Sequence, residues 1–169
     1  MVAQVYFRHA TISVAAKGGA VPVYHRPDWP TQHIFNPAIA VLTRLGLSVR
    51  GSRILAVRGR RTGAWRTTPV NLLTHAGARY LVAPRGNTQW SRNLRAAGEG
   101  ELRLGSKRER FRVRELADSE KDALLRAYLS LWKFEAGKWF DGVTADSPVA
   151  DVAKIAPDHP VFEITALPE

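Results

Sequence analysis

The sequence predicts an α+β fold in which short antiparallel strands form a β-barrel and the helices lie apart from the sheet. Three observations support this prediction. Short strand-like segments are joined by glycine-containing turns, as in a series of hairpins. The segments with helical spacing flank these strands and do not alternate with them. A length of 169 residues suits one domain, and we expect an arm over residues 1–32 and a barrel domain over residues 33–169.

The N-terminal part is predicted to be an arm followed by a helix. Residues 18–32 are rich in glycine and proline, which indicates an extended arm. Apolar side chains then recur at helical spacing and stop at Gly46, namely Ile34, Ala38, Val41, Leu42 and Leu45. Three strands are expected next, over residues 52–58, 65–74 and 78–84, with breaks at Gly59–Gly63 and His75–Gly77.

The second half is predicted to contain two helices and three strands. A helix over about residues 88–97 should stop at Gly98. Strands over about 100–105 and 108–116 flank Gly105-Ser106, which is a hairpin signal. Asp118 can cap a second helix with one apolar face made of Leu124, Leu125, Tyr128, Leu131 and Trp132. Residues 133–158 look irregular and aromatic, and Val161–Leu167 is expected to be the closing strand.

Composition excludes several classes of protein. With 45% hydrophobic and 24% charged residues the chain is typical of a globular protein. No run of 18 apolar residues occurs, and Gln4, Arg8 and His9 interrupt any signal-peptide core. The absence of cysteine excludes disulfides, thiolate nucleophiles and thiolate metal sites, and the five histidines show no metal-ligand spacing. We therefore expect a cytoplasmic protein without a metal site.

The positive charge is concentrated in the middle of the chain. The net charge is +10, and residues 51–114 hold fifteen Lys or Arg against three acidic residues. This excess predicts a polyanionic partner, which could be nucleic acid, an anionic lipid or a phosphorylated cofactor. Nucleic acid is the weakest of the three, because the arginines cluster at turns and the strands lack interleaved aromatic residues. We expect no nucleic-acid binding and retain peripheral membrane contact as an option.

Two neighbouring segments carry the recognisable chemistry, Gly59–Val70 and Val82–Asn93. The first is a glycine-bounded turn with two arginines, followed by a strand that begins with Arg, Thr and Thr. Guanidinium groups, backbone N–H groups and hydroxyls together suit a phosphate ligand. The second segment leads into a helix near Thr88, whose N-terminus is itself an anion site. Pro69 predicts a strand edge or a bulge, because proline cannot donate to a ladder.

The pattern GRRTGxWRxTPV, then YLVAPRG and TQWxRNLRAAG, resembles the deazaflavin (F420)-dependent nitroreductase family. The resemblance runs from about Ile54 to Phe111, and a weaker match occurs in the HPVFEI strand. It implies a split β-barrel of the FMN-binding type and the hydride donor F420, with FMN as the alternative cofactor. It also implies cofactor contacts at Arg60, Arg61, Thr62, Arg66, Thr67, Thr68, Pro69, Val70, Val82, Ala83, Pro84, Arg85, Gln89, Trp90, Ser91, Arg92 and Asn93.

Several of these residues also have a purely structural explanation. The arginines could be solvated turn residues, Trp90 could belong to the core, and Asn93 could satisfy local backbone groups. The aromatic cluster Trp132, Phe134, Trp139 and Phe140 could be a core lid or the wall of a substrate pocket. We take Asn71, Trp132 and Trp139 as candidate substrate contacts and assign no catalytic residue.

No paired carboxylates, Walker pattern or nucleophile motif occurs in the sequence. This is what a reductase would show, because its cofactor supplies the reactivity. The predicted function is an F420-dependent oxidoreductase that transfers hydride to a quinone, a nitroaromatic or an enone. The proton donor could be solvent, Thr68 or Tyr128. The alternative is a non-catalytic binding protein for a cofactor or hydrophobic ligand, and we expect a monomer or homodimer.

Overall fold

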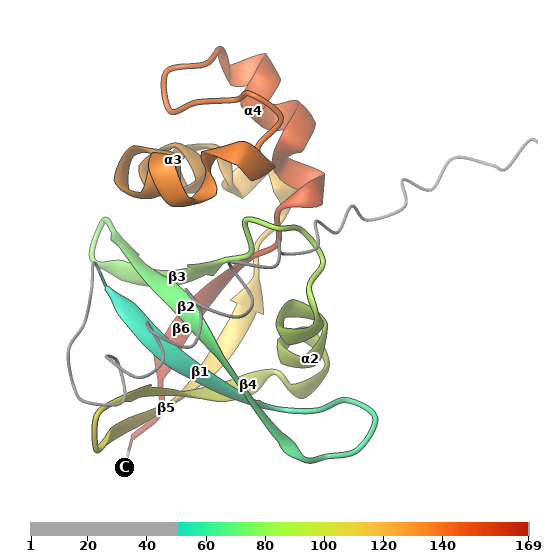
Figure 1. Ribbon diagram of the computed structural model, residues 1–169, viewed down its shortest axis with the longest axis vertical. Coiled ribbons are helices and arrows are strands. Elements are labelled where there is room, and N and C mark those ends of the chain that lie inside the picture. The colour runs from blue at the N-terminus through green and yellow to red at the C-terminus, as the bar shows by residue number, and fades with distance from the viewer. Residues whose placement is uncertain (1–50, 169) are drawn as a thin grey trace, which may run out of the picture.

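The computed structural model describes residues 51–168. Within this range six antiparallel strands close into a barrel in the order β1-β2-β3-β6-β5-β4, as Figure 1 shows. The strands are β1 (Ser52–Arg58), β2 (Trp65–His75), β3 (Ala78–Val82), β4 (Glu99–Leu104), β5 (Lys107–Glu115) and β6 (Val161–Ala166). The split antiparallel barrel of the α+β class is therefore confirmed. The predicted arm and the helix over residues 34–45 lie outside the described residues.

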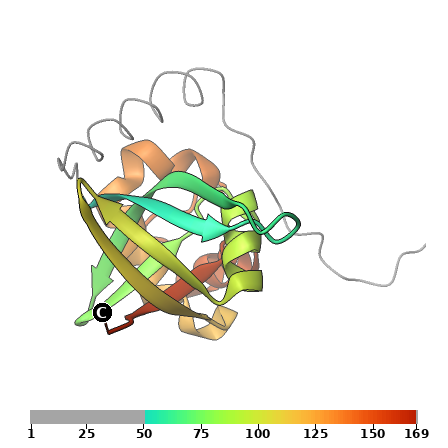
Figure 2. The same ribbon diagram turned by 90° about the horizontal axis from the view of Figure 1, so that it is seen from below.

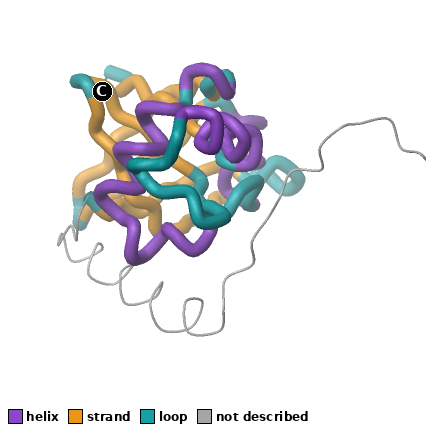
Figure 3. The backbone as a smooth tube through the Cα atoms, turned by 90° about the horizontal axis from the view of Figure 1, so that it is seen from above, coloured by secondary structure: helices purple, strands orange, loops and turns teal. Residues whose placement is uncertain are grey.

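Helices cover the barrel on two sides. Helix α2 (Gln89–Ala97) packs beside β1 and β4, whereas α3 (Asp122–Ala136) and α4 (Val149–Ile155) form a layer over one end of the barrel. Figure 2 shows the barrel from the opposite end, and Figure 3 shows the helical layer from above. Short 3-10 turns span Asp118–Glu120, Gly137–Trp139 and Ala156–Asp158. No helix in the described range is long and apolar enough to cross a bilayer.

The buried apolar residues form two clusters. One fills the barrel and includes Leu55, Leu81 and Phe111. The other lies between the barrel and the helices and includes Leu125, Trp132, Phe140 and Val152. The strands thus bury one face inside the barrel, while Leu73 and Val161 contribute to the layer beneath the helices.

The second helix differs from its predicted form at both ends. Asp118 begins a 3-10 turn and does not cap the helix; its carboxylate instead accepts a hydrogen bond from the buried Lys121 ammonium at 2.6 Å. Leu131 was predicted to face inward, but its side chain is 54% exposed. The buried face centres on Leu125 and Trp132, and Leu131 projects about a third of a turn away from that centre. Helix α4 was not predicted, since residues 133–158 appeared irregular.

Pro69 lies at a strand edge and not at a bulge. The β1–β2 register runs without interruption from Ser52 opposite Asn71 to Arg58 opposite Trp65. Strand β3 pairs with β2 only from Leu72 onward, so the first half of β2 has no strand partner on that side. The Leu72 N–H donates to Gly51 on the β1 side. Because successive residues alternate in direction, the Pro69 nitrogen points to the open side, where its missing N–H costs no ladder bond.

Candidate functional site

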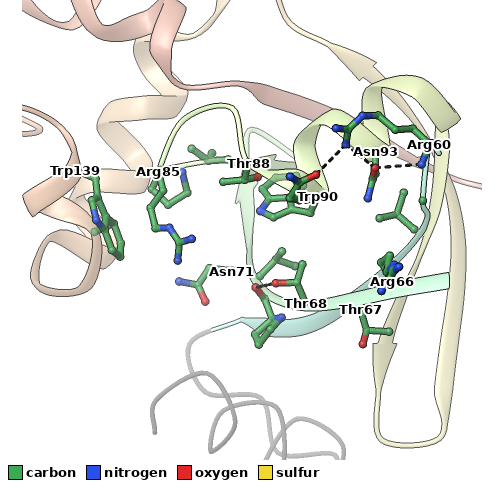
Figure 4. A pocket seen from close by; sticks show the side chains of 18 of the residues that line it. Arg60, Arg66, Thr67, Thr68, Asn71, Arg85, Thr88, Trp90, Asn93 and Trp139 are labelled. Carbon is green, nitrogen blue, oxygen red and sulfur yellow. Dashed lines mark hydrogen bonds between the residues drawn. The ribbon is translucent and has the colours of Figure 1, made fainter. Parts of the chain in front are cut away.

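A cavity of about 1160 Å³ lies along this open edge of β2. The first half of β2 forms one wall, the start of α2 forms a second, and the end of α3 with the Gly137–Trp139 turn forms a third. Figure 4 shows the lining side chains from close by. They are Val57, Gly59, Arg60, Arg61, Thr62, Arg66, Thr67, Thr68, Pro69, Val70, Asn71, Val82, Pro84, Arg85, Thr88, Gln89, Trp90, Asn93, Tyr128, Phe134, Ala136, Lys138 and Trp139.

The β1–β2 turn is held in one shape by its glycines. The Gly59 N–H donates to the Ala64 carbonyl at 2.8 Å, and the Gly63 N–H donates to the Gly59 carbonyl at 2.7 Å. Gly63 has a φ of 67°, which other residues adopt only with strain. A Cβ on Gly59 would lie 3.2 Å from the Ala64 oxygen. The closed turn directs Arg60 and Arg61 to the cavity.

Asn93 connects this turn to helix α2. Its side-chain Oδ1 accepts from the Arg60 backbone N–H at 3.2 Å and from Arg60 Nη1 at 3.0 Å, while the same Nη1 donates to Gln89 Oε1 at 3.0 Å. Figure 4 shows these bonds as dashed lines. Asn93 is only 6% exposed. A buried amide oxygen therefore fixes both the backbone and the guanidinium of Arg60.

Two arginines of the cavity, Arg61 and Arg66, differ from most other arginines of the described chain. Arg79, Arg95 and Arg114 each form an ion pair with a glutamate. The hydrogen bond from Arg79 lowers the pKa of Glu109 below its ordinary value. Among the residues that the structure describes, neither Arg61 nor Arg66 lies within ion-pair distance of a carboxylate. Cations without internal partners are suited to an external anion.

The start of α2 supplies polar groups and one ring. Thr88 is the N-cap, and its hydroxyl accepts from the Ser91 N–H at 3.2 Å. The Ser91 hydroxyl donates to the Thr88 carbonyl at 3.0 Å. Trp90 lines the cavity and also lies 6.0 Å, centroid to centroid, from the core ring of Phe162. Trp90 therefore belongs to the cavity wall and to the edge of the core at once.

The far end of the cavity is aromatic and basic. Tyr128, Phe134 and Trp139 line it together with Lys138. The Arg85 guanidinium lies 5.7 Å from the centroid of the Trp139 ring, and Figure 4 shows the Arg85 side chain between Trp139 and Asn71. This end offers flat apolar walls beside positive charge, which suits an aromatic ligand with electron-rich oxygens.

Most of the predicted contact residues meet in this cavity, but four do not. Ala83 and Ser91 are fully buried, Ser91 through its cap hydrogen bonds. Arg92 stays outside the lining, and its Nε donates to the Thr88 carbonyl at 3.3 Å. Trp132 was expected to contact substrate, but it is 4% exposed and packs in the core beneath the helices, 4.7 Å from the Tyr128 ring.

Sequence reasoning also missed part of the lining. Gly59 and Thr88 lie in the predicted segments but were not named as contacts. Ala136 and Lys138 come from the segment that looked irregular, where no periodicity pointed to the cavity. Phe134 had been named only as part of the aromatic cluster that could be a core lid or a pocket wall. The described residues contain no group of three or more side chains able to hold a metal ion.

The model of the F420H(2)-dependent quinone reductase family matches residues 40–135. This match covers more than half of the chain and includes the β1–β2 turn, β2, α2 and most of α3. The chain belongs to the F420H(2)-dependent quinone reductase family. It is therefore an oxidoreductase whose reductant is the reduced deazaflavin F420H2. None of the curated proteins matches the sequence.

Several solved structures are similar to this quinone reductase family member at low sequence identity. One, described as a domain-swapped dimer, has a TM-score of 0.51 and 16% identity, with 80% of this chain and 99% of that chain covered. An F420-H2 dependent reductase, FDR-A, has a TM-score of 0.49 and 19% identity over 71% and 100% of the two chains. A NimC/NimA family protein from Clostridium acetobutylicum has a TM-score of 0.44 and 17% identity, with 69% of this chain and 74% of that chain covered.

Proposed function

We propose that the protein binds F420H2 in the cavity between β2 and α2 and reduces a flat, electron-poor acceptor, in the first place a quinone. The observation that carries this proposal is the charge of the lining. Five cationic side chains and no acidic ones line the cavity. Arg61 and Arg66 of this lining lie outside ion-pair distance of any carboxylate that the structure describes, whereas Arg79, Arg95 and Arg114 are paired with glutamates. A phosphorylated, acidic cofactor complements such a wall.

The residues present fit the cofactor in chemistry and in space. Arg60, Arg61 and Arg66 would hold its phosphate and acidic tail, helped by the hydroxyl groups of Thr62 and Thr67. The apolar wall formed by Val70, Val82, Pro84 and Trp90 would hold the deazaflavin ring. Pockets for one small molecule usually measure roughly 300–1,000 Å³, so 1160 Å³ leaves space for an acceptor beside the cofactor.

When bound, F420H2 supplies a hydride, that is two electrons with one proton, and the acceptor takes its second proton elsewhere. The protein would orient the acceptor at the aromatic end, where Tyr128 and Trp139 line the cavity and would exclude water from one side. Arg85 would stabilise negative charge that develops on an acceptor oxygen. The second proton would come from solvent, from the Thr68 hydroxyl or from the Tyr128 hydroxyl; both residues line the cavity.

The assay for this proposal follows the loss of F420H2 by absorbance with menadione, a nitroaromatic and an enone offered in parallel. We expect the quinone to be reduced fastest. T68V and Y128F separate the proton donors, because the variant that removes the donor lowers kcat and shifts its pH profile, whereas the other leaves both in place. Tight binding of F420 without reduction of any of the three acceptors would favour a cofactor-binding protein of the same fold.

We further propose a location, an assembly state and a membrane contact for the protein. We place it in the cytoplasm as a monomer or homodimer. Contact with an anionic membrane surface is supported by Phe134, which is 85% exposed at the mouth of the cavity with the Lys133 ammonium 5.2 Å from its ring centroid. Light scattering gives the assembly state. Flotation with anionic vesicles tests the membrane contact, and F134S should abolish it.

A further inference from the structure

Three hydrogen bonds form a closed network between the N-cap of helix α2 and its first turn. The Ser91 N–H donates to the Thr88 hydroxyl oxygen at 3.2 Å, and the Ser91 hydroxyl donates to the Thr88 carbonyl at 3.0 Å. The two hydroxyl oxygens lie 3.1 Å apart. Thr88 is 6% exposed and Ser91 is fully buried, so that bulk water does not compete for these bonds.

The direction of each hydroxyl bond in this network is fixed. A carbonyl oxygen can only accept, so the single hydroxyl hydrogen of Ser91 is used on the Thr88 carbonyl. The bond between the two hydroxyls must therefore run from Thr88 to Ser91, and it uses the hydrogen of Thr88. The Ser91 N–H takes one of the two lone pairs of the Thr88 oxygen. The Thr88 hydroxyl can thus accept one further hydrogen bond and has no hydrogen left to donate.

Thr88 also lines the cavity, whereas Ser91 does not. Figure 4 shows Thr88 between Arg85 and Trp90 on the cavity wall. Trp90 belongs to the apolar wall that is proposed to hold the deazaflavin ring. The network therefore places a hydrogen-bond acceptor of fixed polarity beside the position proposed for that ring.

We propose that Thr88 accepts a hydrogen bond from an N–H group of the bound cofactor, namely the imide N–H of the deazaflavin ring, and that Ser91 is a positioning residue for this contact. The inference rests on the proposed function and specifies how its cofactor is recognised. An N–H can only donate, whereas a ligand hydroxyl could reverse its own direction to suit a donor or an acceptor. Only a ligand N–H makes the affinity depend on the polarity that Ser91 imposes from behind the wall.

The variant S91A isolates the polarity of the Thr88 hydroxyl. Alanine removes the acceptor of the Thr88 hydrogen but keeps the backbone N–H that binds the Thr88 oxygen, so the N-cap is retained. The freed hydrogen then opposes the ligand N–H or stays unsatisfied, which is unfavourable in a buried position. F420 affinity, measured by fluorescence titration of the full chain, should fall at least about fivefold.

The variant S130A is a matched control for the loss of a serine hydroxyl from a helix. The Ser130 hydroxyl donates to the Arg126 carbonyl at 3.0 Å in α3 and does not line the cavity. S130A should leave F420 affinity unchanged. Circular dichroism of each variant shows whether it is folded.

Substitution of Thr88 shows whether Ser91 acts through it. T88S keeps the hydroxyl and should bind F420 much as the wild type does, whereas T88A should bind it more weakly. The addition of S91A to T88A should cause no further loss, because the hydroxyl that Ser91 orients is already absent. Losses that add up in the double variant would assign Ser91 a purely structural role and would overturn the proposal.

The response of S91A separates this inference from the proposed function. A wild-type protein that binds F420 and an S91A protein that binds it equally well or more tightly would overturn the inference alone, since Thr88 would then meet no ligand donor. A wild-type protein that does not bind F420 would overturn the proposed function and the inference together.

Discussion

Replacement of Asn93 tests how the phosphate end of the cavity is built. The side-chain oxygen accepts two hydrogen bonds from Arg60, at 3.2 and 3.0 Å, and is buried. A hydrogen bond contributes about 1 kcal/mol net to stability, so N93A should lose about 2 kcal/mol. The Arg60 guanidinium would then keep only its bond to Gln89. We expect F420 affinity to fall about tenfold, because the turn must be ordered again on binding.

The variant N93D separates positioning from direct contact. Aspartate keeps an acceptor oxygen at the same place, so that the free energy of unfolding should stay within about 0.5 kcal/mol of wild type. N87A is a matched control, because Asn87 accepts one bond from Arg95 and does not line the cavity. It should cost about 1 kcal/mol and leave F420 affinity unchanged.

Urea denaturation and fluorescence titration with F420 measure both quantities for each variant. Wild-type stability in N93A would refute the positioning role of the two hydrogen bonds. An N93D protein that is stable but binds F420 as weakly as N93A would show that position 93 must be neutral, either because the amide donates to the cofactor or because a carboxylate beside Arg60 repels the cofactor phosphate.

Three further outcomes are expected. R61A should weaken F420 binding by about one to two orders of magnitude, and by less at high salt. The control R112A should leave F420 affinity unchanged. An equal loss of F420 affinity in both variants would show that the β1–β2 turn is not part of the site. W139L should raise the KM for menadione and leave the Kd for F420 within about threefold, and a reversed pattern would place the cofactor ring at Trp139. The Arg79–Glu109 pair should stabilise the fold above the ordinary glutamate pKa of about 4.3 and lose that contribution as pH falls through the lowered pKa of Glu109. In E109Q, Tm should therefore fall less steeply than in wild type as the pH is lowered. An E109Q protein whose Tm falls with pH as steeply as that of wild type would contradict this.

The strands and their turns could be predicted because glycine marks the boundaries. The break at Gly59–Gly63 falls between β1 and β2, and Gly98 ends α2 with a φ of 68°. At Pro69 the missing N–H alone predicted either an open strand edge or a bulge. What remained undecided there was the choice between an edge and a bulge, because that choice depends on where β3 begins to pair.

The helical layer could not be predicted in the same way. Helix α4 has seven residues, and only Val152 and Ile155 among them are buried, which gives too short a pattern for a periodicity argument. The backbone of α3 departs from helical values at Trp132, with φ −126° and ψ 29°. Which aromatic side chain of the cluster faces the cavity depends on that departure. For this reason Trp132, and not Phe134, was named as a substrate contact, although both belonged to the predicted aromatic cluster.

The bond between Asn93 and Arg60 was also beyond sequence reasoning. The two residues are 33 positions apart, and they meet only because α2 packs beside β1. The resemblance identified both as contact residues, but it could not show that one holds the other.

The central claim is that the cavity between β2 and α2 binds F420, and a titration tests it most directly. Trp90 and Trp139 both line the cavity, so that intrinsic tryptophan fluorescence should respond to binding. We predict quenching with micromolar affinity for F420, weaker binding of FMN, and loss of the F420 response in R61A. The absence of micromolar binding by either cofactor, or an F420 affinity that R61A leaves intact, would contradict the account.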